Sequence, residues 1–313
     1  MLYGINPSTA LKNIMARKNE RGKNLARSKK NIKSALVVQG GAMRGVFSAG
    51  SLIALENLGF SQGFDAVYGS SGGAMNSAYF LSSQSAFGTS IYYEDINNSK
   101  FINPLRLNKM IDMDYLFDRI IKYKKPLNIS KVIKSKSNFY FFVVEASGTI
   151  VRFNSRDEKL MKLLKASCAL PVYYQPVAFN GNIFLDGGLS KALPVEEDIN
   201  DGCTDILVLL TQPVKLRDSI SSFENIILKV AMPRLGKFVD AWLNSYMDCF
   251  DLAIGRINKK NVNIAAIVPD SDFKLNRLTK DESLLKEAAI DGAKKVYQLF
   301  NKSFDTSNIL RYN

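Results

Sequence analysis

Apolar and polar residues alternate along the first part of the chain in blocks that predict buried strands followed by helices. The run Ala35–Gln39 predicts a buried strand, and Val46–Asn57 has helical spacing of its apolar residues, with Gly59 placed to end the helix. A short strand, Asp65–Gly69, and a helix, Gly72–Leu81, repeat this order. Strand, turn and helix repeated in this way are typical of a parallel sheet covered by helices.

The rest of the chain continues this pattern after one interruption. Residues 85–137 are rich in Asn, Ser, Lys and Tyr and predict an excursion from the sheet, with helical pieces at 105–113 and 115–121. No linker is visible after residue 34, so we expect one domain. The remaining predicted strands are 139–145, 149–153, 177–179, 182–185, 206–211 and 263–268, and the remaining predicted helices are 160–168, 220–260 and 282–304.

Positive charge is concentrated at the start of the chain. Of the net charge of +13, a large share lies in residues 1–33, where Glu20 is the single acidic residue. Leu11, Ile14 and Met15 have helical spacing, which allows a short helix on an anionic membrane surface. A solvated arm is the favoured alternative, and nucleic-acid binding is the least favoured because zinc-finger spacing and RNA-binding aromatic signatures are absent. We therefore divide the chain into a basic N-terminal arm, 1–34, and a domain, 35–313.

Other sequence features indicate the cellular compartment in which the protein is found. No apolar run approaches the roughly 18 residues needed to span a bilayer, and residues 1–30 lack the apolar core of a secretory signal. Cys168, Cys203 and Cys249 have no CxxC spacing, which predicts free thiols in a reducing compartment. We expect a cytoplasmic protein, with peripheral membrane contact through residues 1–33 as a further option.

The chain contains no histidine, which excludes Ser-His-Asp chemistry and histidine-ligated metal sites. It nevertheless carries Gly69-Ser70-Ser71-Gly72-Gly73, which fits the G-x-S-x-G turn of a nucleophilic serine. Ser71 lies between a predicted strand and a predicted helix, as such a turn requires. Gly69 and Gly73 relieve crowding in the turn, and the glycine spacing favours Ser71 over its neighbour Ser70.

Glycine pairs mark the ends of three apolar, strand-like runs: Gly40-Gly41, Gly72-Gly73 and Gly187-Gly188. In open α/β sheets the carboxyl ends of strands form the ligand crevice, so we expect the three pairs to meet at one site. The alternative is that each pair only makes a turn. Without histidine, Asp186 is the candidate base for Ser71, provided that burial raises its proton affinity.

The first glycine pair opens a turn whose backbone N–H groups can stabilise a developing oxyanion. Its sequence is neither a dinucleotide-binding G-x-G-x-x-G nor a P-loop, and Arg44 within it can orient the turn or face an anionic substrate group. The predicted oxyanion loop is Gly40, Gly41, Ala42, Met43, Arg44 and Gly45.

Taken together, these residues resemble the patatin-like phospholipase family. The resemblance covers about residues 35–211 and includes Ala166–Pro171 followed by Pro176-Val177, while Arg256 and the segment 264–269 match one bacterial subgroup more loosely. The resemblance implies a three-layer α/β fold, related to the α/β-hydrolases, with a mostly parallel central sheet covered by helices.

The resemblance also implies a lipid acyl hydrolase without metal or cofactor. Ser71 is then the nucleophile, Asp186 the base, and the N–H groups of Gly41, Ala42 and Met43 the oxyanion hole. Ala42 stands where the family often has glycine, which is tolerated unless the loop needs a positive φ there. Apolar residues within 85–145 suit either an acyl groove or ordinary core packing.

Two other functions remain open. One is a carboxylesterase or thioesterase that uses the same dyad without a lipid interface, and the other is a non-catalytic lipid-binding or membrane-binding protein of the same fold. The expected partner in each case is a lipid or acyl ester.

Overall fold

The computed structural model describes residues 3–24, 31–106, 109–157, 159–171, 173–191, 193–214 and 262–311. The predicted helix at 220–260, Arg256 and Cys249 lie outside the described residues, as do Arg27, Lys29 and Lys30 of the basic segment.

A central sheet runs through the described part of the chain in the order β5-β6-β3-β2-β1-β7-β8, and β4 also pairs with β3. Five neighbouring strands, β3, β2, β1, β7 and β8, are parallel, and β4, β5 and β6 are antiparallel to their neighbours. The strands are β1 (Ser34–Val38), β2 (Ala66–Gly69), β3 (Asn138–Glu145), β4 (Ile150–Asn154), β5 (Val177–Phe179), β6 (Asn182–Asp186), β7 (Asp205–Leu209) and β8 (Asn263–Ile267).

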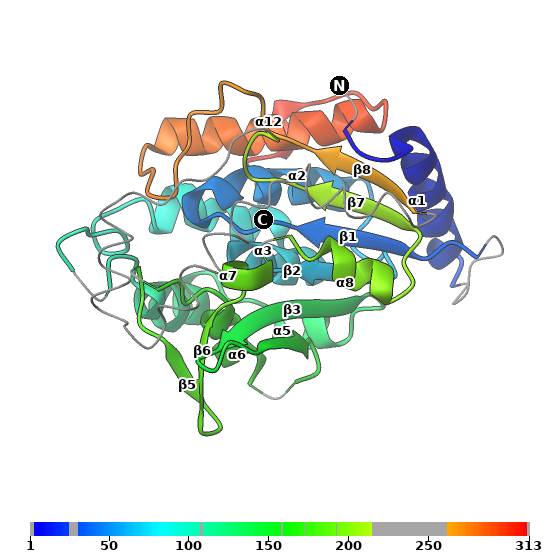
Figure 1. Ribbon diagram of the computed structural model, residues 1–313. Coiled ribbons are helices and arrows are strands. Elements are labelled where there is room, and N and C mark those ends of the chain that lie inside the picture. Colours follow the sequence, from blue (N-terminus) through cyan, green and yellow to red (C-terminus); the bar gives the residue numbers. More distant parts are fainter. Residues whose placement is uncertain are drawn as a thin grey trace.

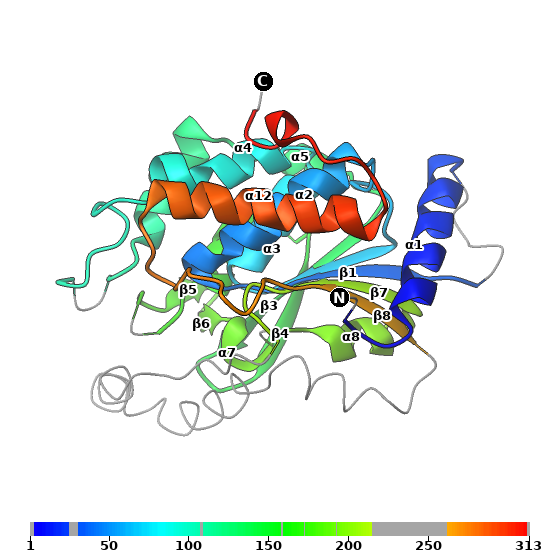
Figure 2. The same cartoon turned by 90° about the horizontal axis from the view of Figure 1, so that it is seen from above.

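Helices cover both faces of this sheet (Figure 1). Seen from above, α2, α3, α4, α5 and α12 lie on one side of the strands, and α7 and α8 lie on the other (Figure 2). This is the predicted three-layer α/β fold with a mostly parallel sheet. The helices named so far are α2 (Gly45–Asn57), α3 (Gly72–Leu81), α4 (Ser85–Ser90), α5 (Ile129–Ile133), α7 (Gly188–Lys191), α8 (Val195–Asn200) and α12 (Glu282–Leu299).

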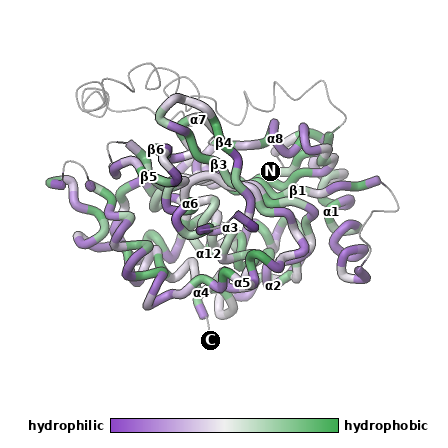
Figure 3. Tube along the Cα trace, turned by 90° about the horizontal axis from the view of Figure 1, so that it is seen from below, coloured by the Kyte–Doolittle hydropathy of each residue, from purple (hydrophilic) through white to green (hydrophobic). Residues whose placement is uncertain are grey.

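Each face of the sheet has its own hydrophobic core, because successive side chains of a strand point to opposite faces. In β1, Leu36 and Val38 pack on the side of α2, while Ala35 and Val37 pack on the side of α8. Hydrophobic residues are concentrated in the interior and hydrophilic ones toward the outside (Figure 3). All five residues of β1 are buried, as expected for a central strand.

The length of β3 explains how a late segment reaches the ends of the early strands. β2 pairs with β3 from Ala66↔Asn138 to Gly69↔Phe141, and β3 then continues for four residues beyond β2. The antiparallel strand β6 pairs with this overhang and ends at Asp186, opposite Val143. The third glycine pair therefore follows the second strand of a β-hairpin, β5 and β6, which the Asn180-Gly181 turn predicts from the sequence.

The first helix, α1 (Pro7–Gly22), packs against the domain. Ala10, Leu11 and Ile14 are buried, and the Arg17 guanidinium is also buried, donating two hydrogen bonds to Asp65 next to β2. Ahead of α1, a backbone bridge joins Tyr3 to β8. Residues 7–22 thus form a packed helix where we favoured a solvated arm, because one face is apolar and its buried cation has a carboxylate partner.

The excursion between residues 85 and 137 differs from prediction in one place. The predicted helix at 105–113 is wrong for the described residues up to 112, which form turns and an isolated antiparallel bridge between Ile102 and Ile111. Arg106 holds this turn by donating hydrogen bonds to the carbonyls of three earlier residues, and the Asn103 N–H donates to the Met110 carbonyl at 2.8 Å. The helical prediction at 115–121 agrees with a π-helix at Tyr115–Lys124.

The described helices include none that is both long enough and apolar enough to cross a bilayer. Within the same residues, no group of three or more Cys, Asp or Glu side chains is arranged to hold a metal ion.

Candidate active site

Ser71 occupies a strained turn between β2 and α3. Its backbone has φ 55° and ψ −134°, a combination that is rare for a residue with a side chain. Such a strained conformation persists only where the surrounding structure enforces it. Close packing enforces it here, since a Cβ on Gly73 would lie 2.2 Å from the Val38 carbonyl oxygen. Ser71 is half-buried at the N-terminus of α3, which favours negative charge.

The structure brings Ser71 and Asp186 into direct contact. The Ser71 hydroxyl donates a hydrogen bond of 2.7 Å to Oδ2 of Asp186. The other carboxylate oxygen, Oδ1, accepts a 2.7 Å hydrogen bond from the N–H of Gly188, which fixes the orientation of the carboxylate. A Cβ on Gly187 would lie 2.1 Å from the Phe142 carbonyl oxygen, so the turn after Asp186 can pass this close to β3 because it is glycine.

Burial makes Asp186 a stronger base than a free aspartate. The side chain is 2% exposed, and desolvation raises its pKa to about 7, against the opposing effects of the hydrogen bonds from Ser71 and Gly188 and of the positive charge of Arg277. A base whose pKa is near the working pH is well matched to proton transfer. The Cys168 thiol faces the same carboxylate, and burial raises its pKa well above the ordinary value.

The predicted oxyanion loop lies directly beside Ser71. A Cβ on Gly40 would lie 2.7 Å from the Ser71 Cβ, so the two turns are in contact. Ala42 has a φ of +50°, the conformation that makes its methyl group unfavourable relative to the glycine common in the family. The loop continues as the turn η1 (Ala42–Arg44) into α2.

The backbone N–H groups of this loop are not equivalent. Met43 donates its N–H to the Arg277 carbonyl oxygen at 3.3 Å, and Arg44 donates to the Gly41 carbonyl oxygen at 3.1 Å. Within the described residues, the N–H groups of Gly41, Ala42 and Gly72 donate no hydrogen bond. These three groups, like the N–H of Gly40, therefore retain a free donor among the described residues, whereas the predicted donor Met43 is already engaged.

Two side chains that the sequence reasoning did not single out support the two turns. Ser167 accepts a hydrogen bond from the Ser71 N–H at 3.2 Å and donates to the Phe142 carbonyl at 2.7 Å. Thr211, just after β7, donates to the Gly40 carbonyl at 2.6 Å. Ser167 lies in the Ala166–Pro171 segment that carries the family resemblance, and Thr211 ends a predicted strand. These two features of the sequence could have identified both residues.

Arg277 is a further site residue that the sequence reasoning missed. It precedes α12, is largely buried and lines the same cavity as Ser71 and Asp186. Its position is fixed by the surrounding loop, in which Leu275 is buried and the Phe273 ring packs edge-on against Phe47 at 5.8 Å. Nothing in the local sequence distinguishes this arginine from a surface residue.

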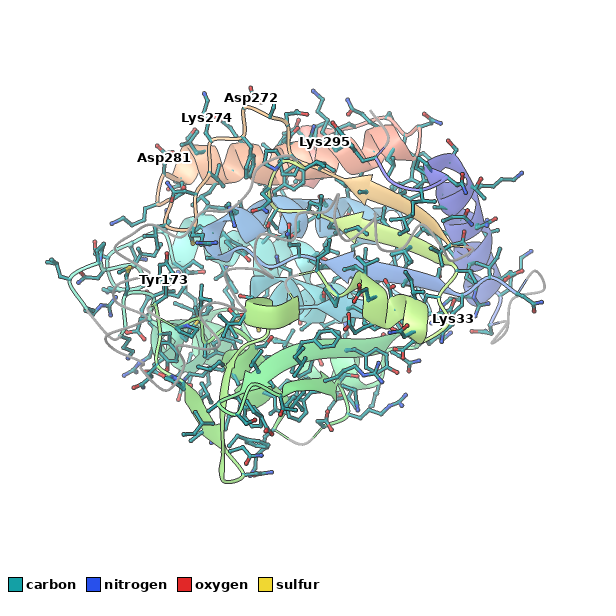
Figure 4. All side chains as sticks on the ribbon, viewed as in Figure 1. Lys33, Tyr173, Asp272, Lys274, Asp281 and Lys295 are labelled. Carbon is teal, nitrogen blue, oxygen red and sulfur yellow. The ribbon has the colours of Figure 1, made fainter. Side chains whose placement is uncertain are left out.

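The cavity that opens beside Ser71 is lined largely by apolar side chains. Several come from the excursion between residues 85 and 137, and Tyr173 adds an aromatic ring from the segment before β5 (Figure 4). The two arginines in its lining are Arg44 and Arg277, and among its described residues the one carboxylate is Asp186. The apolar lining includes Met75, Ile91, Ile96, Phe101, Ile111, Met113, Leu116, Ile121 and Leu170.

The fold and the sequence match agree on the class of protein. The family model described as patatin-like phospholipase matches residues 36–199, more than half of the chain, and the chain belongs to this family of lipid acyl hydrolases.

Two individual proteins are similar to this chain. The uncharacterized protein YjjU of Escherichia coli (strain K12) is 29% identical over 190 residues, which cover 58% of this chain and 53% of that protein. The match thus spans about half the length of this relative. The crystal structure of VipD from Legionella pneumophila aligns with a TM-score of 0.39 and 11% identity, covering 88% of this chain and 69% of that one.

Proposed function

We propose that this protein cleaves fatty-acyl esters of phospholipids or related lipids through a Ser71–Asp186 dyad. The observation that carries the proposal is the 2.7 Å hydrogen bond from the Ser71 hydroxyl to a buried carboxylate whose pKa is raised to about 7. No other residue type is needed as base, which fits a chain without histidine.

The reaction divides into two steps. As the Ser71 oxygen attacks the acyl carbonyl, Asp186 takes its proton and later delivers it to the leaving alcohol, which departs as an acyl-enzyme forms. Asp186 then accepts a proton from water as the water oxygen attacks the acyl-enzyme, and it returns that proton to the Ser71 oxygen when the fatty acid is released. The oxyanion of both steps then accepts hydrogen bonds from the N–H groups of Gly41, Ala42 and Gly72, which donate to no other group among the described residues.

Lipid substrates are favoured over small polar esters by the lining of the cavity. Its many aliphatic and aromatic side chains suit an acyl chain, since burial of apolar surface supplies binding energy. The dyad is equally compatible with a carboxylesterase or thioesterase, and parallel assays on short-chain esters, thioesters and phospholipid vesicles distinguish these substrates.

Replacement Ser71→Ala tests the dyad. We expect loss of ester hydrolysis by about 10³-fold or more and loss of covalent labelling by a fluorophosphonate, with an unchanged circular dichroism spectrum. The neighbouring replacement Ser70→Ala is the control and keeps its labelling. Retained hydrolysis in Ser71→Ala would remove this assignment.

A further inference from the structure

A second cavity, of about 380 Å³, lies near the amino ends of β2 and β3, whereas Ser71 follows the carboxyl end of β2. It is formed by the end of α1, the loop between α2 and β2, and the residues just before β3. Four cations line it: Lys18, Arg21, Lys23 and Lys136. The described residues that line it include no carboxylate.

The strands separate this cavity from the candidate active site. Arg21 pairs with Asp65, which directly precedes β2, whereas Ser71 lies just beyond the end of the same strand. At about 3.3 Å per residue, the six residues from 65 to 71 place the two sites roughly 20 Å apart. A ligand in the second cavity therefore does not compete with an acyl ester at Ser71.

The cations of this cavity retain hydrogen-bonding capacity. The Lys18 ammonium donates one bond, at 2.5 Å, to the Leu58 carbonyl, and the Lys136 ammonium donates at 2.6 Å to Asn24; each ammonium has three N–H groups. Arg21 donates from Nε to the Gln62 carbonyl at 2.8 Å and from Nη1 to Asp65 at 2.9 Å. Among the described residues, its Nη2 has no hydrogen-bond partner, although the side chain is only 10% exposed.

Positive charge is crowded around this cavity. The pKa of Lys18 is lowered from its ordinary value by burial and then by the charge of Lys302. The pKa of Arg21 is likewise lowered by burial first, with Asp65 opposing and Arg17 adding to the effect. An anion placed here gains several favourable charge interactions and relieves the repulsion among the cations.

We propose that the cavity bounded by Lys18, Arg21, Lys23 and Lys136 binds a phosphate group. Arginine offers a planar fork for phosphate oxygens and the lysines offer compact charges, a combination suited to a tetrahedral dianion. The phosphate can belong to a free phosphate ion or to the head group of an anionic phospholipid. The site is independent of the proposed hydrolysis.

Calorimetric titration tests the proposal on the full chain in the Ser71→Ala background, so that no lipid is cleaved. The probes are inorganic phosphate and vesicles of phosphatidylcholine with or without phosphatidic acid. We expect saturable binding of at least one anionic probe at physiological salt, weakened about tenfold or more by Lys23→Glu with Lys136→Glu. Binding of phosphate alone assigns a soluble ligand, and binding of phosphatidic acid vesicles alone assigns a lipid head group.

The matched control reverses two exposed lysines elsewhere, Lys274→Glu with Lys280→Glu. Lys274 lies on the loop before α12, away from α1 (Figure 4). The control has the same net charge as the test variant, so equal weakening by both would show a non-specific attraction to a basic protein and would overturn the proposal. Absence of saturable binding for both anionic probes would overturn it as well.

Discussion

At the scale of single residues, the strength of Asp186 as a base is set by its surroundings. An exposed aspartate with a pKa of about 3.9 accepts a serine proton poorly, whereas the buried Asp186 has a pKa of about 7. The hydrogen bond from Gly188 leaves one carboxylate oxygen for Ser71. In the proposed dyad, burial thus supplies the proton affinity that imidazole supplies in Ser-His-Asp hydrolases.

The pH dependence of hydrolysis follows from this pKa. A protonated Asp186 cannot accept the serine proton, so kcat/KM should be low in acid, rise through about pH 7 and then level off. Asp186→Asn, which cannot act as a base, should lose about 10²–10⁴-fold in kcat at all pH values. A wild-type profile that is flat between pH 5 and 9 would contradict Asp186 as the base.

Arg277 should tune that profile. Its positive charge lowers the pKa of Asp186, so Arg277→Gln should move the acidic limb of kcat/KM to higher pH, whereas Arg277→Lys should restore most of its position. Arg44 lines the same cavity and Cys168 faces the carboxylate, and both stay unchanged in these variants.

The control is Arg152→Gln, which removes an exposed charge paired with Asp201 and should leave the acidic limb of kcat/KM in place. If Arg277→Gln lowers kcat/KM equally at all pH values without shifting the acidic limb, Arg277 has a structural role only.

At the scale of elements, the sequence predicted most of the strands and the first two strand–turn–helix units. These were predictable because the spacing of apolar residues and the position of glycine turns determine secondary structure within a few residues. Examples are the strand at Ala35–Gln39, the helix end at Gly59 and the hairpin at Asn180-Gly181. The glycine pairs also indicated which turns meet, although the register by which β6 returns along β3 had no local signal.

The remaining differences come from contacts between distant residues. A polar residue in a helix is expected to face solvent, yet Arg17 is buried because Asp65 lies opposite it. Arg277 approaches Asp186 through the packing of Phe273 on Phe47, which no sequence period reveals. The engagement of Met43 by the Arg277 carbonyl is invisible for the same reason.

The crossing of α2 and α12 depends on two glycines. A Cβ on Gly292 would lie 2.1 Å from the Phe47 carbonyl oxygen, and one on Gly50 would lie 2.0 Å from the Ala289 carbonyl oxygen. Gly292→Ala should therefore force the helices apart and lower the free energy of unfolding by about 1–3 kcal/mol, measured by urea denaturation. Gly22→Ala, where a Cβ meets nothing within 4 Å, should change it by less than about 1 kcal/mol. Equal effects of the two replacements would exclude close packing as the cause.

At the scale of the whole molecule, α1 closes one end of the domain. An ion pair between the buried Arg17 and Asp65, the residue before β2, holds α1 against the domain. Ahead of the helix, Tyr3 pairs with the edge strand β8. Arg17→Met should leave Asp65 short of one partner and cost about 3–5 kcal/mol of stability, seen as a lower midpoint in denaturant. Lys12→Met, an exposed position on the same helix, should have little effect. A comparable loss in both would argue that helix composition, and not the ion pair, matters.

Under the proposed mechanism, the separation of 115 residues between Ser71 and Asp186 has a consequence for the newly made chain. A nascent polypeptide that has emerged only through α3 possesses its attacking hydroxyl but lacks the group that withdraws the proton. Competence to break an ester then begins when the hairpin of β5 and β6 docks on the overhang of β3. Under that mechanism, the proposed activity is latent until the hairpin that carries Asp186 has been made and has docked.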